Sequence, residues 1–287
     1  MRNSGPFGLG TVGAWAGLCG LMLVSAGCAE NSRDAQRQQQ ETLNVGYAAL
    51  EQRQFDRAMA AADQYLTRTP TGAGSAEAHY LRGRILEERP ASSQQESAAN
   101  WQQAKAAYEQ ALAAQPTPAV EWRAHAGLGN IAYFQEDYGT SLAELGAAYD
   151  RLSERAVQRS AEMGASPEVK AWILYRIGLC QQRLGRMEDA DRSFAAVQEQ
   201  FGGTVPAQRA REHQGQHQFW VQVATFADSG MADRAADELK REGKNVAKLK
   251  DTAGHFVVRV GPVPTYQAAR NIKTMYAARY PAAVIVP

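Results

Sequence analysis

Apolar and polar positions follow the same pattern twice in the last quarter of the chain. In each copy, alternating apolar residues predict a strand, a stretch with helical spacing predicts a helix, and a short apolar run predicts a second strand. A single offset aligns the copies and places Val221 on Val258, Val223 on Val260 and Ala232 on Ala269. The first copy covers residues 219–226, 229–242 and 246–249, and the second covers residues 255–262, 265–279 and 283–286.

Each copy is a β-α-β unit, and the right-handed connection of such units predicts that both helices lie on one face of a four-stranded sheet. Side chains alternate along a strand, so the sequence also predicts which residues face the helices. The predicted core comprises Val221, Val223, Phe256, Val258 and Val260 from the strands and Met231, Ala235, Leu239, Ile272, Met275 and Tyr276 from the helices. The open face is predicted to carry Trp220, Gln222, His255, Val257 and Arg259, joined by Thr225 only if the strand ends or twists before it.

The segments VQVATF from residue 221 and VVRVGP from residue 257, each followed by a helix with an alanine at its start, resemble a SPOR domain (sporulation-related repeat). The resemblance implies binding of peptidoglycan, especially of glycan strands without stem peptides, through the open face. Gln222 and Arg259 match polar positions of the family, Thr225 matches a nearby serine, and Val257 stands where the family often has an aromatic residue. The predicted peptidoglycan-binding residues are Gln222, Arg259, Trp220, Thr225, His255 and Val257. An aromatic ring beside amide and cationic donors suits a sugar.

The first residues have the features of a targeting segment. Arg2 gives a positive start, and no charge follows before Cys28. Residues 24–28, VSAGC, resemble a bacterial lipobox, which implies that residues 1–27 are a signal peptide and that Cys28 is lipidated. An uncleaved anchor is the alternative. Residues 28–41 are polar and predict a flexible tether, unless the glutamines already start the first helix. Ala29 after the cysteine favours the outer over the inner membrane, with the chain facing the periplasm.

Residues 42–213 predict a helical repeat domain that is rich in alanine, leucine, glutamine and glutamate. A small residue recurs where two helices cross, and an aromatic residue recurs to fill the gap beside it, as with Gly83 and Tyr108 or Gly178 and Phe194. Four such copies resemble tetratricopeptide (TPR) repeats, most clearly in residues 174–197. Residues 88–100 are predicted as an insertion, residues 151–165 as a lengthened helix, residues 206–213 as a capping helix and residues 214–218 as a linker before the sheet domain at 219–287.

Composition and motifs argue against an enzyme. The net charge of +1 gives no argument for nucleic acid as a partner. Cys180 is predicted to be a buried apolar residue, and no cluster of cysteines suggests a metal site. Gly127-Leu128-Gly129 matches a dinucleotide fingerprint only on paper, because it lies within a helical pattern. His213 and His217 are predicted to be solvated linker residues. The sequence therefore predicts no catalytic residues, no metal and no cofactor.

The predicted fold is an α + β multidomain chain, with a TPR-like solenoid followed by a βαββαβ domain. The function that it favours is a cell-envelope lipoprotein that binds peptidoglycan at division sites and scaffolds protein partners through its repeats. A component for outer-membrane assembly or trafficking, in which the repeats are the working part, is the alternative.

Overall fold

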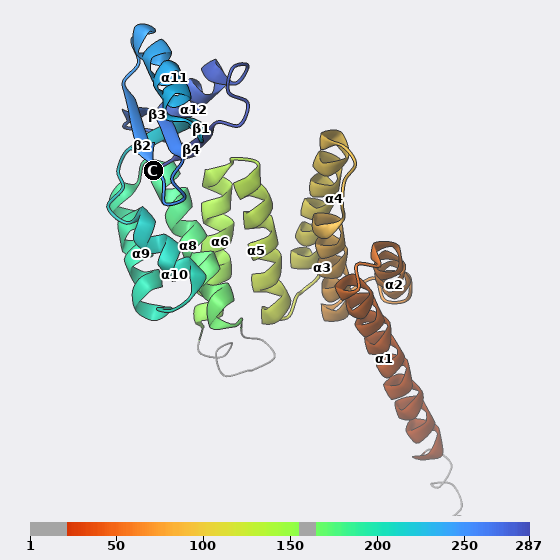
Figure 1. Cartoon of the computed structure of the whole chain (residues 1–287). Coiled ribbons are helices and arrows are strands. Elements are labelled where there is room, and N and C mark those ends of the chain that lie inside the picture. The colour runs from red at the N-terminus through yellow and green to blue at the C-terminus, as the bar shows by residue number, and fades with distance from the viewer. Residues whose placement is uncertain (1–21, 155–164) are drawn as a thin grey trace, which may run out of the picture.

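The computed structural model describes residues 22–154 and 165–287, apart from the side chains of residues 22–33, 35 and 36. A helical solenoid is followed by a sheet domain at its C-terminal end (Figure 1). The helices are α1 Met22–Glu51, α2 Phe55–Arg68, α3 Ala73–Glu88, α4 Gln94–Ala113, α5 Pro118–Phe134, α6 Tyr138–Ser153, α8 Pro167–Arg183, α9 Met187–Gln200, α10 Val205–His213, α11 Ser229–Arg241 and α12 Tyr266–Tyr276. The strands are β1 Phe219–Phe226, β2 Val246–Lys250, β3 Phe256–Val263 and β4 Val284–Val286.

The solenoid is built from helical hairpins that pair α1 with α2, α3 with α4, α5 with α6, and α8 with α9. The predicted packing of small residues against large ones is confirmed where these helices cross. A methyl group on Gly178 would lie 2.6 Å from the ring of Phe194, and one on Gly83 would lie 2.4 Å from the ring of Tyr108. Gly129 meets Leu145 in the same way. Glycine lets the backbones approach, and the buried side chain opposite fills the space.

The segments that start three of the solenoid helices share one local signal. Thr117, Ser166 and Thr204 each accept a hydrogen bond from a backbone N–H in the first turn, and a proline stands at one of the first two helical positions. The hydroxyl satisfies a donor that the helix leaves unpaired, and proline lacks a donor that would need a partner there. The predicted capping helix at 206–213 is confirmed as α10, which packs on α8 and α9.

Some predictions for the solenoid are wrong or fall outside the described chain. The predicted flexible tether at 28–41 is part of the continuous helix α1, which agrees with the alternative that the glutamines already start the first helix, because alanine, glutamine, arginine and glutamate residues favour a helix. These fourteen residues span about 21 Å as a helix, whereas an extended chain of the same length would reach more than about 40 Å. The predicted insertion at 88–100 contributes the first turns of α4. Helix α6 ends at Ser153, and residues 155–164 of the predicted lengthening lie outside the described residues.

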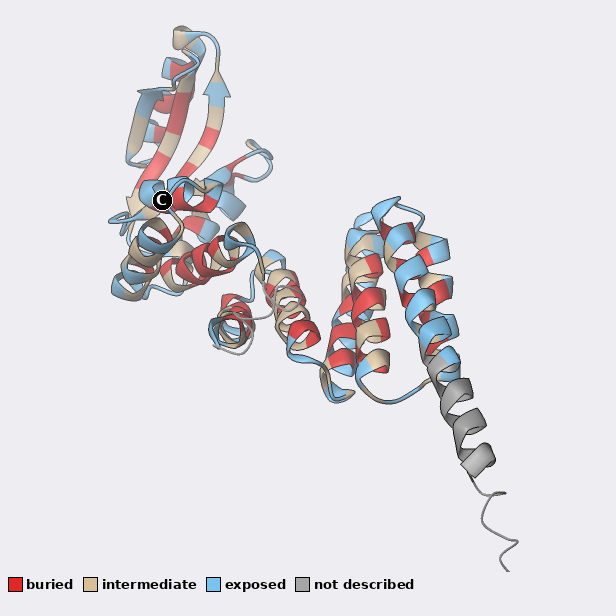
Figure 2. Cartoon of the chain, turned by 90° about the horizontal axis from the view of Figure 1, so that it is seen from below, coloured by how far each residue is buried: buried red, intermediate tan, exposed pale blue. Residues whose placement is uncertain are grey.

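The sheet is antiparallel throughout and has the strand order β2-β3-β1-β4, so each β-α-β unit has another strand between its own two. Helix α11 packs on β2, β3 and β1, and α12 packs on β1, β3 and β4. Buried residues line the strands and helices of this layer (Figure 2). The predicted core is confirmed for Val221, Val223, Val258, Val260 and Leu239.

Two predicted core residues of this domain lie in solvent. Met231 is 51% exposed and Met275 is 62% exposed. Alanines take the positions that face the strands, since Ala232, Ala236 and Ala269 are all buried. Small side chains let both helices lie close to the sheet, and this rotates the neighbouring methionines outward.

One tyrosine joins the solenoid and the sheet domain. The hydroxyl of Tyr266, at the start of α12, lies 3.0 Å from the hydroxyl of Tyr138 at the start of α6. The guanidinium of Arg183 stacks on Tyr266 at 5.2 Å and on Tyr138 at 4.8 Å, both measured to the ring centroids. Tyr266 also packs edge-on against Phe219, the first residue of β1. The same ring thus contacts the cores of both domains, and a cation held over aromatic faces fixes its orientation.

The prediction that both linker histidines are solvated is wrong for His213. Its ring lies at 5.7 Å from Tyr175 and 5.5 Å from Phe194, and its Nδ1 is 3.1 Å from Gln182 Oε1. It therefore belongs to the apolar end of the solenoid, because α10 continues through residue 213. His217 is exposed, and its Nε2 lies 2.7 Å from Asp191 Oδ2.

A methyl group added at Gly178 should destabilise the solenoid. We expect Gly178→Ala to lower the free energy of unfolding by about 1–3 kcal/mol, because the new Cβ overlaps the buried ring of Phe194. Gly146→Ala is the matched control, since a Cβ at this position of α6 would meet no atom within 4 Å, and alanine there should add about 0.5–1 kcal/mol. Urea unfolding followed by circular dichroism measures both. Equal effects of the two substitutions would contradict the packing described.

The buried ring of His213 should make the solenoid sensitive to acid. Burial, together with the nearby guanidiniums of Arg183 and Arg209, lowers the pKa of His213 to about 4. The unfolded chain binds this proton near pH 6.5 and the folded chain does not, so this stability is complete above pH 6.5 and is lost as the pH falls toward 4. We expect a loss on the order of 2 kcal/mol, which is reduced from the full shift because the ring is partly exposed. This loss is measured by the melting temperatures of the parent chain and of His213→Gln across this pH range. If the two melting temperatures fell in parallel as the pH is lowered, His213 would not be the source of the acid sensitivity.

Candidate functional site

The sheet has one face that no described helix of the domain covers. Cross-strand pairs place its residues in rows, because residues directly opposite each other in an antiparallel ladder lie on the same face. Gln222 of β1 lies opposite Arg259 of β3 and Val284 of β4. Trp220 lies opposite Val286, and Ala247 of β2 lies opposite Arg259. The middle row of the open face therefore reads Ala247, Arg259, Gln222 and Val284.

A β-bulge in β1 changes the face on which Thr225 lies. Gln222 pairs with Arg259, but Ala224 pairs with Val258, so β1 has one residue more than β3 over this stretch. The extra residue shifts the alternation, and Thr225 then pairs with Val257 on the open face. Strict alternation would have placed Thr225 under the helices with Val221 and Val223. The sequence predicted Thr225 on the open face only if the strand ended or twisted before it, and the bulge provides this change.

The bulge brings three of the predicted site residues together. Gln222 Nε2 donates a hydrogen bond to Thr225 Oγ1 at 3.2 Å, and Arg259 Nη2 donates to Gln222 Oε1 at 3.4 Å. The Nε of Arg259 is buried and has no hydrogen-bond partner among the described residues. Gln222 and Arg259 are half-buried at the centre of the sheet, where an amide, a hydroxyl and a guanidinium are held by one another. Such a cluster offers directed donors to a neutral, oxygen-rich ligand.

Trp220 adds an apolar surface beside this cluster. Its ring contacts Gly261, where an added Cβ would lie 3.3 Å from the Cε3 atom of Trp220. Gly261 has a φ of +138°, which glycine adopts readily and other residues do not. A side chain at position 261 would displace the indole from the sheet. The half-buried ring lies in the row next to Gln222, with Val286 opposite.

The other two predicted site residues occupy less favourable positions. Val257 lies on the open face, but only 6% of it is exposed, since Thr225 and Leu249 flank it on the neighbouring strands. His255 is exposed at the hairpin before β3, and its backbone N–H and ring Nδ1 lie 2.8 and 3.3 Å from the carboxylate of Asp251. The hydrogen bond from the backbone of His255 lowers the pKa of that carboxyl. The polar contacts of His255 are thus with its own hairpin and not with the central cluster.

The sequence did not indicate the edge-strand residues that complete the face. Leu249 of β2 and Val284 of β4 are 45% and 47% exposed with the solenoid in place, so both edges of the face are open to solvent. Their strands were predicted, but their faces follow only from the strand order. A split β-α-β arrangement, with each edge strand antiparallel to its neighbour, is the signal that would have placed them.

Other chemistry finds little support in the described part of the chain. Residues 22–154 and 165–287 contain no group of three histidine, cysteine, aspartate or glutamate side chains that could hold a metal ion. Within the same residues, no helix has the length and hydropathy needed to cross a bilayer. Gly127 and Gly129 lie inside α5 against Tyr108 and Leu145, as packing residues. Cys180 is free and buried, as predicted, and its Sγ lies 3.3 Å from Ser141 Oγ.

Fold and site together define a binding protein with two modules, a helical repeat solenoid and a split β-α-β domain with a polar open face. Comparison with family models agrees. The SPOR domain model matches residues 215–287, and tetratricopeptide repeat models match residues 43–99, 95–157 and 173–204. The chain therefore carries TPR repeats followed by a C-terminal SPOR domain. No curated protein matches the chain. SPOR domains bind peptidoglycan, TPR repeats mediate protein interactions, and both are binding modules without catalysis, which indicates a cell-envelope protein.

Proposed function

We propose that this chain is a lipoprotein of the cell envelope that binds glycan strands stripped of their stem peptides and recruits protein partners to them. The single observation that carries the proposal is the hydrogen-bonded cluster of Gln222, Thr225 and Arg259 at the centre of the open face. Glycan strands without stem peptides are expected where the cell wall is being divided, and division sites are therefore the proposed location. Trp220 supplies the apolar surface on which a sugar ring stacks.

The chemistry of the face fits an uncharged sugar better than an anion. The cluster holds a single guanidinium, that of Arg259, and one of its N–H groups already donates to Gln222. Acetamido and hydroxyl groups both donate and accept hydrogen bonds, which matches an amide and a hydroxyl side by side. The half-buried position of the cluster raises the value of each hydrogen bond relative to one in open solvent. His255 and Val257 remain candidates at the margin of this surface.

Lipidation at Cys28 would hold the chain at a membrane, with the outer membrane favoured by Ala29. The part of α1 that follows Cys28 then connects the anchor to the hairpin of α1 and α2. Incorporation of labelled palmitate into the chain and into Cys28→Ala tests this part of the proposal. The parent chain should take up the label and Cys28→Ala should not, whereas a parent chain that takes up no label and keeps residues 1–27 would point to an uncleaved anchor instead.

The alternative is a component for outer-membrane assembly or trafficking, in which the solenoid is the working part. A pocket of about 540 Å³ on the solenoid favours it, since this pocket is separate from the open sheet face. Removal of residues 215–287 distinguishes the two functions. Under our proposal, the deletion should have the same phenotype as loss of the whole protein. Under the alternative, its phenotype should be mild.

Substitution of the central cluster should weaken binding to the wall. We expect Gln222→Ala and Arg259→Ala each to weaken binding of the full chain to amidase-treated sacculi by about tenfold, because each removes directed hydrogen bonds from a half-buried site. Gln267→Ala and Arg241→Ala are the matched controls, since both lie on helices that cover the other face of the sheet. Co-sedimentation with sacculi, before and after amidase treatment, measures the effect. The proposal would be refuted if the parent chain bound the sacculi no more strongly than a carrier protein does. It would also be refuted if Gln222→Ala bound them as strongly as the parent chain.

A further inference from the structure

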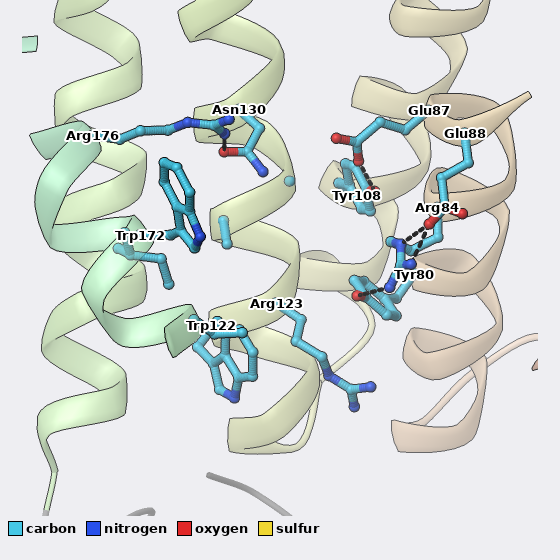
Figure 3. Close-up of a pocket in the computed structure, with 14 residues that line it drawn as sticks. Tyr80, Arg84, Glu87, Glu88, Tyr108, Trp122, Arg123, Asn130, Trp172 and Arg176 are labelled. Carbon is cyan, nitrogen blue, oxygen red and sulfur yellow. Dashed lines mark hydrogen bonds and ion pairs between the residues drawn. The ribbon is translucent and has the colours of Figure 1, made fainter. Parts of the chain in front are cut away.

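The solenoid has a pocket lined by aromatic and charged side chains. Helices α3, α5 and α8, which are the first helices of three successive hairpins, contribute most of its lining, and Tyr108 of α4 adds to it. Figure 3 shows the indoles of Trp122 and Trp172 on one side and Glu87 with Tyr108 on the other. The volume of about 540 Å³ lies in the range of sites that take a small molecule or a few side chains of a partner.

One wall of the pocket is apolar and rigid. Trp122 of α5 and Trp172 of α8 are half-buried, and Ile173 and Val169 of α8 line the same side. Trp172 packs edge-on against Tyr175, and Arg209 stacks on the indole at 5.3 Å from the ring centroid. Because these contacts hold the indole, a large apolar side chain that packs on it costs the protein little conformational freedom. Aromatic residues of this kind carry much of the binding energy of protein interfaces.

Two of the three arginines in the pocket already have partners. Arg84 pairs with Glu88 and contacts the hydroxyl of Tyr80. Arg123 stacks on the ring of Tyr80 at 4.8 Å and lies 3.3 Å from Glu77. Because both guanidiniums already pair with a carboxylate, we assign them to the shape of the pocket and not to binding an acidic ligand.

Arg176 differs from the other two. It donates to Asn130 Oδ1 and stacks on Tyr133 and Phe134 at 5.3 and 5.2 Å from the ring centroids. No carboxylate of the described residues lies within ion-pair distance of it. Burial lowers the pKa of this guanidinium. A half-buried cation without a counter-ion gains when a ligand brings a carboxylate.

Glu87 provides a carboxyl group on the wall that faces Arg176. It accepts a hydrogen bond from the hydroxyl of Tyr108 at 2.6 Å, and burial raises the pKa of its carboxyl. It lies on the wall of the pocket opposite Arg176 (Figure 3). The two opposite charges thus face each other across the pocket, and a peptide between them can present a carboxylate to one and backbone N–H groups to the other.

We propose that this pocket binds a protein partner through a segment in which an acidic side chain stands next to a large apolar or aromatic one. The carboxylate would pair with Arg176, and the apolar side chain would pack on Trp172 and Trp122. This inference deepens the proposed scaffolding role of the solenoid and rests on it. An uncharged sugar would stack on the indoles but would leave Arg176 without a counter-ion, so a peptide fits the pocket better.

A random-peptide display selection on the purified full-length chain in detergent tests the proposal. The enriched peptides, once synthesised, should carry aspartate or glutamate within a few positions of an aromatic residue. Their affinity, measured by calorimetry, should fall at least about tenfold for Arg176→Gln and for Trp172→Ala. Arg192→Gln, at an exposed arginine of α9, is the matched control and should bind as the parent chain does. Thermal melting checks that each variant is folded, and Arg176→Lys, which keeps the charge, should retain part of the affinity.

The outcomes separate this inference from the proposed function. Arg176→Gln should still sediment with amidase-treated sacculi, and Gln222→Ala should still bind the selected peptides. Selection of no peptide, selection of peptides without an acidic residue, or equal affinity for the parent chain and Arg176→Gln would overturn the inference. Displacement of the peptides by soluble muropeptides at lower concentration would also overturn it, because the pocket would then belong to a fragment of the wall.

Discussion

The arrangement of the two modules depends on the contact of Tyr266 with Tyr138 and Arg183. Tyr266 begins α12 of the sheet domain, and its ring reaches the core of the last hairpins of the solenoid. Arg183 stacks on both tyrosines and on Tyr133, so one cation holds three rings in place. The ion pair between Arg270 and Glu136 at 2.9 Å adds a second contact between the two modules. A sheet domain held in this way fixes the direction in which the solenoid extends from whatever the open face binds.

The proposed glycan site depends on two local irregularities of the central strands. The bulge in β1 brings Thr225 to the open face beside Gln222, and a second shift of register at Gly261 lets the indole of Trp220 lie against the sheet. In a regular ladder the hydroxyl would lie under the helices, and any residue with a Cβ at position 261 would displace the ring. The site is thus assembled by departures from the ideal strand, which occur in the two strands at the centre of the sheet.

Much of the fold could be predicted from the sequence because its signals are periodic. The doubled β-α-β pattern predicted every strand of the sheet within a residue or two, and the pairing of glycine with a large side chain predicted where the helices cross. The misses have physical causes. Periodicity alone does not show that alanines face the strands while Met231 and Met275 face solvent. It also does not reveal a bulge, and the polar composition of residues 28–41 left a tether and a helix both open. The burial of His213 escaped prediction because the helical pattern of residues 206–213 does not show that the end of α10 packs on Tyr175 and Phe194.

The most direct measurement of glycan binding by the open face is a titration of the full chain with a denuded glycan oligosaccharide, followed through the NMR signals of the tryptophan indoles and arginine side chains. We expect the signals of Trp220 and Arg259 to shift with saturation, while those of Trp122 and Trp172 stay in place. Shifts confined to Trp122, Trp172 and Arg176, with Trp220 and Arg259 unchanged, would contradict this, because the glycan would then bind the solenoid and not the open face of the sheet.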